Sequence, residues 1–435
     1  MGQQNKMSTI ANVYLWGEHV GAVAWNAKDR VADFAYTPEF CKSGLQVSPL
    51  IMPLSPTEIY SFPAHRDSNT FKGLPGLLAD SLPEKFGNKL LSVWLAKQGR
   101  SFNDLNPVER LCYLGARGMG ALEFMPDTDG IHSKKDDSMD LDGLLDVARK
   151  VMDEHNQVEQ LNTDTPNFER LIQIGTSAGG AKAKAVIAWN DSTKEIMSGQ
   201  GECKAGFEHY LLKLSGVSND EHESDADTGR MEMAYHLMAV EAGITMMYSR
   251  LITDADGVGH FMTRRFDRKD VDMKYHVQTY AAIAHQDRDP VGQCSYEHLF
   301  ATARELGVGQ PSITELFKRM VFNIIARNQD DHTKNHAFMM DGDGQWSITP
   351  AYDLCFAYKK NSRFIDSHQM TCNGKRDNFT LYDIVESARA ANVKNPKKII
   401  SEVNNAIANW HDIAEGVKLP SDKAIAISKM FRNIR

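Results

Sequence analysis

Cysteine is scarce in this chain, and the few cysteines are not arranged to bind anything. The 435 residues include six of them, and no two form a C-x-x-C pair. A disulfide framework or a structural zinc site requires cysteines that are paired or regularly spaced. We therefore expect a protein of the reducing cytoplasm without a disulfide framework.

Long apolar segments and an excess of positive charge are also lacking. No apolar stretch approaches the roughly 18 residues that cross a bilayer, so we expect no membrane partner. The net charge of −8 disfavours strong, sequence-independent binding of nucleic acid by this chain alone, because such binding neutralises phosphates with lysine and arginine. The 42% hydrophobic and 24% charged residues are typical of a globular protein, and the length allows two or three domains.

Strand patterns dominate the first half of the chain. Residues 9–26 carry two apolar runs around a glycine-containing turn, which predicts a hairpin. Residues 81–84 have the pattern of a helix N-cap, at Ser81, with a proline in the first turn. The segment 168–175 leads into a glycine-rich loop that we expect to lie between two strands, and further strands are expected over 185–190 and 208–216.

Helical patterns dominate the second half. Residues 228–244 predict a helix that stops at Gly243, and a hairpin across residues 256–257 follows. Further helices are predicted over 295–307, 312–328, 380–391, 396–414 and 421–433. This order of elements indicates an α+β protein with a strand-rich part followed by a helical part.

A polar run between two apolar segments carries the strongest chemical signal. In VFNIIARNQDDHTKNHAFMM (321–340), Asp330 is followed five residues later by Asn335. A predicted hairpin then leads to PAYDLC, which places Asp353 eighteen residues after Asn335. Phosphoryl transfer uses one carboxylate to orient the attacking hydroxyl, and an amide oxygen with a second carboxylate to hold Mg²⁺. Protein kinases have the same five-residue spacing in H-R-D-x-x-x-x-N, and their metal-binding Asp also follows a short hairpin.

Other interpretations of this loop stay open. Lys334 lies within the loop, where it is able to neutralise the phosphate in transfer. The whole segment could instead be a solvated turn between a helix and a hairpin. Alternatively, His332 and His336, four residues apart, could bind a divalent metal for hydrolysis with Asp330 or Asp331. His336 is expected to begin a strand, however, so the two histidines would not share a helical face.

A kinase also needs a nucleotide site, which we expect upstream of this loop. The segment IGTSAGGAKAK supplies glycines 175, 179 and 180, and glycines let backbone N–H groups approach phosphate oxygens. Its spacing matches neither G-x-x-x-x-G-K-[ST] nor G-x-G-x-x-G. Lys213 lies among apolar residues, where an unpaired ammonium is costly, and is therefore the better candidate for a phosphate-binding lysine.

Two further parts of a nucleotide site are expected after Lys213. Glu232, early in the next predicted helix, is a candidate partner for this lysine, with Glu241 as the alternative. The segment TRRFDR (263–268) occupies the place of the hinge that meets adenine in a kinase, although such a segment can equally be a surface cluster of salt bridges.

At this point the sequence resembles the HipA family, bacterial serine/threonine protein kinases that are the toxins of toxin–antitoxin pairs. The resemblance covers nearly the whole chain, through GLLADSLPEKFG, TSAGGAKAK, YLLKL, RRFDR, NQDDHTKNH and TPAYDL. The D-x-H-x-K-N core followed by T-P-x-Y-D is highly specific to the family. The glycine-rich loop departs from it, because Lys182 and Ala183 stand where many members carry a glutamine and a glutamate.

The resemblance implies a two-lobed protein-kinase-like α+β fold with an additional N-terminal HipA-type α/β domain. The corresponding domains are expected over 1–125 for the N-terminal domain, 126–268 for the strand-rich lobe and 269–435 for the helical lobe. The cofactors it implies are ATP and Mg²⁺.

Residue roles follow from the matching positions. The family implies that Asp330 is the catalytic base and that Asn335 and Asp353 hold Mg²⁺. The position of Lys334 in the loop makes it a second catalytic candidate. The nucleotide is expected to meet Gly175, Thr176, Ser177, Gly179, Gly180, Lys184, Lys213, Glu232, Arg264, Arg265, Phe266 and His332. Ser177 aligns with the serine that such kinases phosphorylate on their own loop, with Thr176 as the competing acceptor. A phosphate there would repel ATP and switch the toxin off.

The family also implies partners that composition does not reveal. These are a small helix-turn-helix antitoxin of the HipB type, operator DNA bound through that antitoxin, and a protein substrate in translation, such as an aminoacyl-tRNA synthetase. Two rival functions stay open: a small-molecule or lipid kinase, and a kinase-shaped co-repressor with little catalysis. The joint presence of Asp330, Asn335, Asp353 and Lys213 argues against the second.

Overall fold

The computed structural model describes most of the chain and divides it into two compact units. The described residues are 9–126, 140–152, 166–175, 182–201, 203–217, 225–269 and 273–434. One unit comprises residues 1–225, 267–277 and 342–344, and the other comprises 226–266, 278–341 and 345–435.

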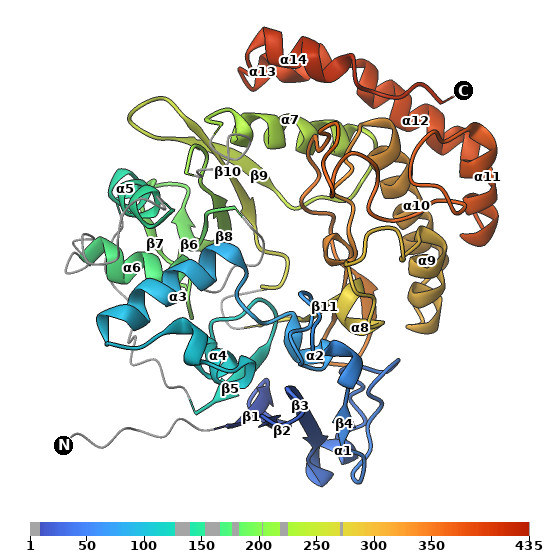
Figure 1. The fold of residues 1–435 in the computed structure, drawn as a ribbon. Helices are drawn as coiled ribbons and strands as arrows, with labels where there is room; N and C mark the ends of the chain where they lie inside the picture. The colour runs from blue at the N-terminus through green and yellow to red at the C-terminus, as the bar shows by residue number, and fades with distance from the viewer. Residues whose placement is uncertain are drawn as a thin grey trace. The chain divides into compact units, whose positions relative to one another are not determined.

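An antiparallel sheet begins the first unit, with the strand order β4-β3-β2-β1-β5 (Figure 1). Its strands are β1 (Ile10–Leu15), β2 (Glu18–Asn26), β3 (Val31–Tyr36), β4 (Tyr60–Ser61) and β5 (Leu122–Met125). The two-residue turn between β1 and β2 consists of Trp16 and Gly17, both with positive φ, which matches the twist of a tight hairpin. The hairpin predicted over 9–26 is therefore confirmed.

Helices of the first unit pack on this sheet and on one another. They are α1 (Pro38–Ser43), α2 (Gly76–Ala79), α3 (Lys85–Lys97), α4 (Pro107–Leu114), α5 (Leu141–Met152) and α6 (Pro166–Gly175). The predicted N-cap at Ser81 is wrong, because α3 begins only at Lys85 and its N-cap, Glu84, makes no capping hydrogen bond with its side chain. The backbone N–H of Ser81 instead donates to Leu78, which places Ser81 in the turn after α2.

The segment before the glycine-rich loop was predicted as a strand, and this prediction is also wrong. It forms α6 (Pro166–Gly175), in which Leu171, Ile172 and Ile174 are fully buried. Apolar residues at spacings of three and four form one face of a helix. This spacing indicates the helix that the structure shows, whereas the short apolar run had suggested a strand. Gly175 ends the helix so close to α3 that a Cβ atom there would lie 2.5 Å from Leu90 Cδ1, so a larger residue would force the Leu90 side chain to move.

Three strands complete the first unit after α6. They are β6 (Lys184–Asn190), β7 (Ile196–Ser198) and β8 (Phe207–Lys213), with β6 paired to both of the others. The strands predicted over 185–190 and 208–216 are confirmed in their main parts.

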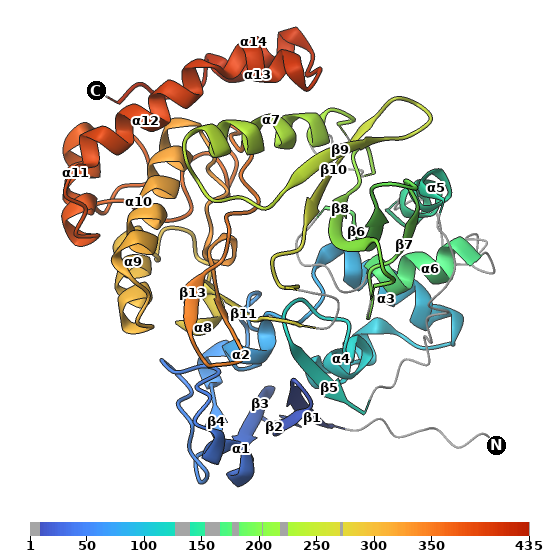
Figure 2. The same cartoon turned by 180° about the vertical axis from the view of Figure 1, so that it is seen from behind.

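The second unit begins with a helix and a hairpin. Helix α7 (Thr228–Glu241) lies along the hairpin of β9 (Ser249–Thr253) and β10 (Gly259–Arg264) in both ribbon views (Figures 1 and 2). Gly243 follows α7 with a φ of +75°, as expected of a glycine that ends a helix. A second hairpin, of β12 (Ala337–Met340) and β13 (Trp346–Ile348), follows the polar loop.

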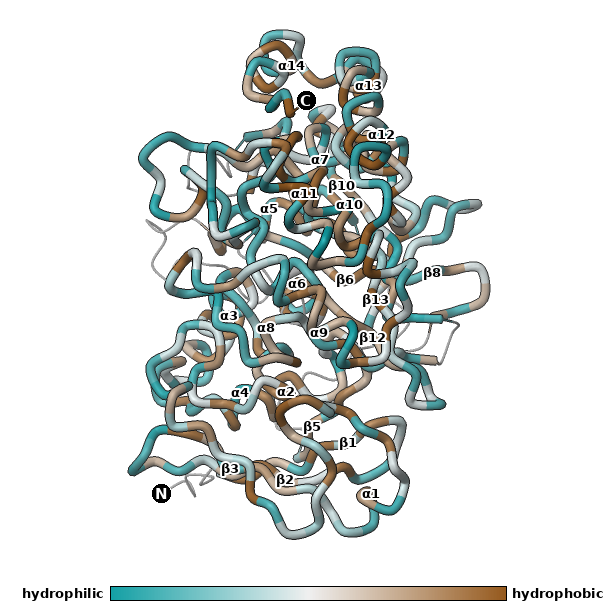
Figure 3. Tube along the Cα trace, turned by 90° about the vertical axis from the view of Figure 1, so that its right-hand side faces the viewer, coloured by the Kyte–Doolittle hydropathy of each residue, from teal (hydrophilic) through white to brown (hydrophobic). Residues whose placement is uncertain are grey.

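The remaining helices form the helical part of this unit. They are α8 (Tyr280–Ile283), α9 (Tyr296–Glu305), α10 (Gln310–Ile325), α11 (Leu381–Ala390), α12 (Pro396–Ala408), α13 (Trp410–Gly416) and α14 (Ser421–Ser428). Hydrophilic and hydrophobic residues alternate along α12 and α13 (Figure 3), as in helices with one face on a core. The core includes α10, which packs against α9, α11 and α12.

Two of the predicted helices differ from the structure. The single helix expected over 396–414 is divided at Asn409 into α12 and α13. The helix expected to reach residue 433 ends at Ser428, and the chain then turns so that the backbone N–H of Arg432 donates to Ile325 at the end of α10. Among the helices of the described ranges, none has both the length and the apolar character required to span a membrane.

Candidate active site

The polar loop is held between the end of α10 and the start of β12. The chain leaves α10 at Ala326, and Arg327 reverses its direction with a φ of +60°. A short 3₁₀ turn over Thr333–Asn335 follows, and His332 caps it by accepting a hydrogen bond at Nδ1 from the N–H of Lys334 at 3.2 Å. The Tyr352 hydroxyl donates to the carbonyl of Lys334 at 2.7 Å. The loop therefore has a fixed backbone.

The two adjacent carboxylates of this loop have different environments. Asp331 is fully buried, whereas 48% of the Asp330 side-chain surface is exposed. Protein atoms nevertheless crowd the Asp330 carboxylate, and this desolvation raises its pKa above the usual value, with the nearby carboxylates of Asp353 and Asp331 adding to the rise. Cationic neighbours, His332 and Arg288, oppose it. A raised pKa is the property of a carboxylate that accepts a proton near neutral pH.

Asp331 serves a different purpose, because three donors hold it inside the protein. Its Oδ2 accepts hydrogen bonds from the Tyr296 hydroxyl and from His368 Nδ1, both at 2.7 Å, and its Oδ1 accepts one from the backbone N–H of Gln369 at 2.8 Å. Although burial alone would raise the pKa of Asp331, His368 and the other hydrogen bonds lower it. Asp331 is therefore an ionised anchor of the loop.

Asn335 and Asp353 have the chemistry of a magnesium site. The Asn335 amide donates from Nδ2 to the carbonyl of Asp330 at 2.7 Å, so the other atom of that amide is an oxygen. Asp353 has a φ of +53°, a backbone conformation that is uncommon outside glycine and is concentrated at functional sites. Amide and carboxylate oxygens are the ligands that Mg²⁺ prefers in proteins, usually one or two of them beside phosphate and water. The residues present fit this ion.

The alternative of a hydrolytic metal site is not supported. His336 is fully buried, and desolvation lowers its pKa to about 3. Neither of its ring nitrogens has a hydrogen-bond partner. In the part of the chain that the structure describes, no three His, Cys, Asp or Glu side chains gather in a way that would hold a metal.

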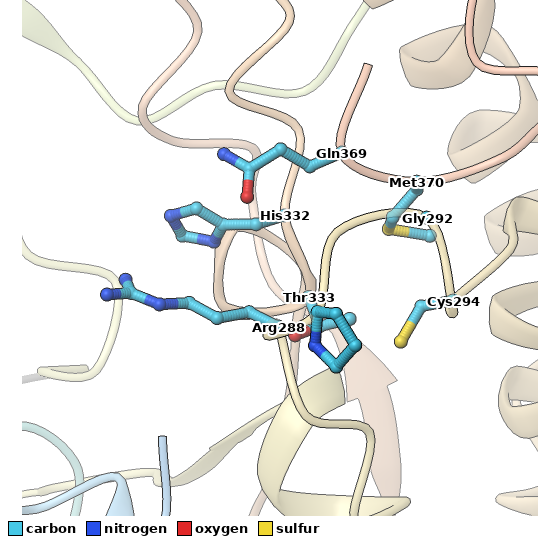
Figure 4. Close-up of a pocket in the computed structure, with 8 residues that line it drawn as sticks. Arg288, Gly292, Cys294, His332, Thr333, Gln369 and Met370 are labelled. Atoms are coloured by element: carbon cyan, nitrogen blue, oxygen red, sulfur yellow. The ribbon is translucent and has the colours of Figure 1, made fainter. Parts of the chain in front are cut away.

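A narrow pocket lies at the catalytic loop, next to His332 and Thr333, and contains residues that the sequence did not single out. It is lined by Arg288, Pro290, Gly292, Cys294, His332, Thr333, Gln369 and Met370. The side chains of Arg288, His332 and Gln369 extend to the same side of this pocket (Figure 4). Gln369 Nε2 donates to Asp330 Oδ1, so Gln369 holds both carboxylates of the loop. Arg288 and Gln369 belong to no recognisable motif, and only their position in the fold identifies them.

Two of the expected nucleotide-binding lysines face each other in the first unit. Lys184 on β6 and Lys213 on β8 are directly opposite in the antiparallel register, and only 4% and 7% of their surfaces are exposed. Residues directly opposite lie on the same face of a sheet, with Cβ atoms about 5 Å apart. Two lysine side chains that start from the same face of the sheet are suited to bind a polyphosphate.

Most of the expected glycine-rich loop cannot be placed from the described residues. Gly175 is the last residue of α6, and Thr176, Ser177, Gly179 and Gly180 lie outside the described residues. The roles assigned to these residues stay predictions.

The expected adenine-binding segment lies in the second unit as far as Phe266. The Phe266 ring stacks on Tyr352, with ring centroids 5.8 Å apart, and Tyr352 in turn contacts the catalytic loop at Lys334. Arg264 ends β10, and Arg265 is buried. Glu232 is buried on α7, but it belongs to a different unit from Lys213, so their pairing stays a prediction.

Comparison with known protein families decides the identity of this chain. A model of the HipA-like C-terminal domain matches residues 176–410, and a model of the HipA N-terminal domain matches residues 11–125. The chain belongs to the HipA family. No curated protein sequence gave a significant match.

A solved HipA structure has the same fold as this chain. The HipA of Shewanella oneidensis MR-1, solved in complex with HipB and operator DNA, is similar over 96% of this chain and 95% of that chain, with a TM-score of 0.62 at 17% identity. A Helicobacter pylori proinflammatory kinase, CtkA, is similar over 51% of this chain and 92% of that chain, with a TM-score of 0.31 at 13% identity, which is too low to support an inference. The predicted α+β fold of the HipA type is confirmed.

Proposed function

We propose that this protein is an ATP- and Mg²⁺-dependent protein kinase that transfers the γ-phosphoryl group of ATP to a serine or threonine. The observation that carries the proposal is the catalytic loop, in which an accessible Asp330 with a raised pKa lies beside two oxygen ligands, Asn335 and Asp353. Transfer of labelled γ-phosphate to a hydroxyl side chain is the experiment that tests it.

In this mechanism each residue of the loop has one task. Asp330 orients the acceptor hydroxyl and takes its proton as the oxygen attacks the γ-phosphorus, while the bond from that phosphorus to the β,γ-bridging oxygen breaks and ADP leaves. The side chains of Asn335 and Asp353 would hold Mg²⁺, which would neutralise phosphate charge. Lys334 lies in the same loop, where its ammonium group adds positive charge near the group in transfer. Gln369 fixes the Asp330 carboxylate by donating to Oδ1.

Lys213→Gln should weaken ATP binding by about 10–100-fold, the loss expected when a hydrogen bond to a charged group is removed. Lys194→Gln is a matched control, because Lys194 is 58% exposed in the turn after β6. Isothermal titration of the folded variants with ATP and Mg²⁺ measures the effect. If Lys213→Gln binds ATP as tightly as the control while Lys184→Gln does not, the phosphate contact belongs to Lys184.

Ser177→Ala should abolish self-inactivation. A phosphate on Ser177 adds nearly two negative charges to the loop that approaches ATP, so the parent protein should lose activity during incubation with ATP while the variant stays active. Thr176→Ala is the matched control and should inactivate like the parent. Rates measured after increasing times with ATP decide the matter, and loss of activity at the same rate in Ser177→Ala would refute this switch.

The biological role that we infer is that of a toxin which phosphorylates a component of translation, for example an aminoacyl-tRNA synthetase. Membership of the HipA family supports this role. The Shewanella protein of the same fold was solved with HipB and operator DNA, which supports a helix-turn-helix antitoxin that brings this chain to an operator. The net charge of −8 is consistent with DNA contacts made by the partner.

A further inference from the structure

The segment after α14 places Arg432 against residues that hold the catalytic loop. Nη1 of Arg432 donates to the carbonyl of Ile324 and to His368 Nε2, both at 2.8 Å. Nη2 donates to Asp377 Oδ1 at 2.5 Å. The side chain is 13% exposed. Arg432 is therefore tied to α10, to the segment before α11 and to His368 together.

The bond to Arg432 determines where His368 carries its proton. A guanidinium group has only donors and stays protonated in proteins, so His368 Nε2 must be the acceptor in this pair. The proton of a neutral imidazole then lies on Nδ1, which donates to Asp331 Oδ2 at 2.7 Å. His368 is fully buried, and Arg432 and Asp331 thus favour the same tautomer from opposite sides of the ring.

Further hydrogen bonds connect Asp331 to Asp330, the carboxylate that reacts. Gln369, next to His368, donates its backbone N–H to Asp331 and its side-chain amide to Asp330. The segment 368–369 and the catalytic loop are consequently joined at both carboxylates. If the hydrogen bond between His368 and Asp331 changes, we expect the adjacent Gln369 to move. Asp330, which Gln369 holds, should then move as well.

We propose that Arg432 and His368 are positioning residues for phosphoryl transfer: Arg432 fixes the tautomer of His368, and His368 holds Asp331 so that Asp330 stays aligned. This inference rests on the proposed kinase activity. Neither residue touches the reacting atoms. Hydrogen-bond partners orient metal-ligating and catalytic histidines in the same way in other proteins.

Removal of Arg432 leaves Nε2 of the buried His368 without its donor. A buried acceptor without a donor is costly, so the imidazole shifts to find another partner. Its contact with Asp331 then loosens, and the loop loses one of its three anchors. The expected result is a lower kcat with little change in KM for ATP.

A double-mutant cycle separates this role from a general effect on folding. Asparagine at position 368 places an amide N–H where Nδ1 stands but is too short to reach Arg432. Arg432→Ala should lower kcat by about 10-fold in the parent, in the range seen for residues that orient another group. In the His368→Asn background the same change should cost less than about 2-fold, because the link is already absent. Equal losses in both backgrounds would overturn the proposal.

Two control variants test whether the effect is specific to the contact between Arg432 and His368. Asp377→Asn weakens the ion pair with Arg432 but leaves its bond to His368, so kcat should stay within about 2-fold of the parent. Arg389→Ala removes an arginine that is 71% exposed on α11 and should behave like the parent. A kcat reduced by Asp377→Asn as strongly as by Arg432→Ala would show that the ion pair, not the histidine, is responsible.

The tautomer itself gives a readout that needs no activity. In ¹⁵N-detected histidine spectra of the full chain, the signal absent from His368→Asn identifies residue 368, and it should show a proton on Nδ1 and none on Nε2. A proton on Nε2 in the parent would overturn the proposal whether or not the protein is a kinase. If the parent shows the expected tautomer but transfers no phosphate to any acceptor, the contact between Arg432 and His368 is supported. The proposed kinase activity is then contradicted.

Discussion

Replacement of Asp330 by alanine should lower the rate of phosphoryl transfer by about 10²–10⁴-fold, the contribution expected of a general base. ATP affinity should stay within a few-fold of the parent, because Asp330 faces the acceptor hydroxyl and is not a ligand of the nucleotide in this account. The raised pKa of Asp330 adds a second signature. The base works only when ionised, so the rate in the parent should fall as the pH drops through a value above 3.8, and this limb should vanish in the variant.

Single-turnover rates and ATP titration of the same preparation measure the two effects separately. Asp412→Ala is the matched control, because Asp412 is an exposed carboxylate on α13 and should leave both quantities unchanged. Expression of the parent should also arrest growth while Asp330→Ala does not. If ATP affinity disappears together with the rate, Asp330 serves the nucleotide and our assignment of the base is incorrect.

Loss of the Asp353 carboxylate should remove the Mg²⁺-dependent part of nucleotide binding. Because Asp353 has a φ of +53°, alanine there adds backbone strain to the loss of a ligand. Asparagine tolerates this conformation well and is the better variant. At a ligand concentration of 100 times Kd, ATP with Mg²⁺ stabilises a protein by about 2.7 kcal/mol, and this should drop well below 1 kcal/mol in Asp353→Asn.

Thermal unfolding with ATP, in the presence of Mg²⁺ and then of EDTA, measures this change. The parent should lose most of its stabilisation when EDTA replaces Mg²⁺, whereas Asp353→Asn should give the same small shift in both. Unfolding without nucleotide serves as the control for folding, since the two proteins should then differ little. A variant that keeps the full difference between Mg²⁺ and EDTA would exclude Asp353 as a metal ligand.

The catalytic loop could be predicted from the sequence because its residues are close together in the chain. Asp330, Asn335 and Asp353 are linked by short spacings and one hairpin, and the hairpin of β12 and β13 lies where the sequence indicated. The stop at Gly243 and the turn at Trp16 and Gly17 also depend on backbone conformations that neighbouring residues reveal. Features of this kind can be read from a few adjacent positions.

The errors and omissions have a different origin. The segment before the glycine-rich loop illustrates one such error, because a short apolar segment is compatible with both a strand and a helix. In the structure it forms the helix α6, which ends at Gly175 beside Leu90 of α3. The separate roles of Asp330 and Asp331 depend on Tyr296, His368 and Gln369, which lie 35 to 39 residues away in the sequence. No local pattern marks such partners, so only the fold distinguishes the reacting carboxylate from the buried one.

The most direct test of kinase activity starts from purified, unphosphorylated protein incubated with γ-labelled ATP and Mg²⁺ beside Asp330→Ala. Mass spectrometry then locates any phosphate on the chain. Our account predicts label on Ser177 in the parent and none in the variant. Absence of label from both proteins, with no transfer to any added serine- or threonine-containing protein, would contradict the kinase and favour a binding module that acts through its partner.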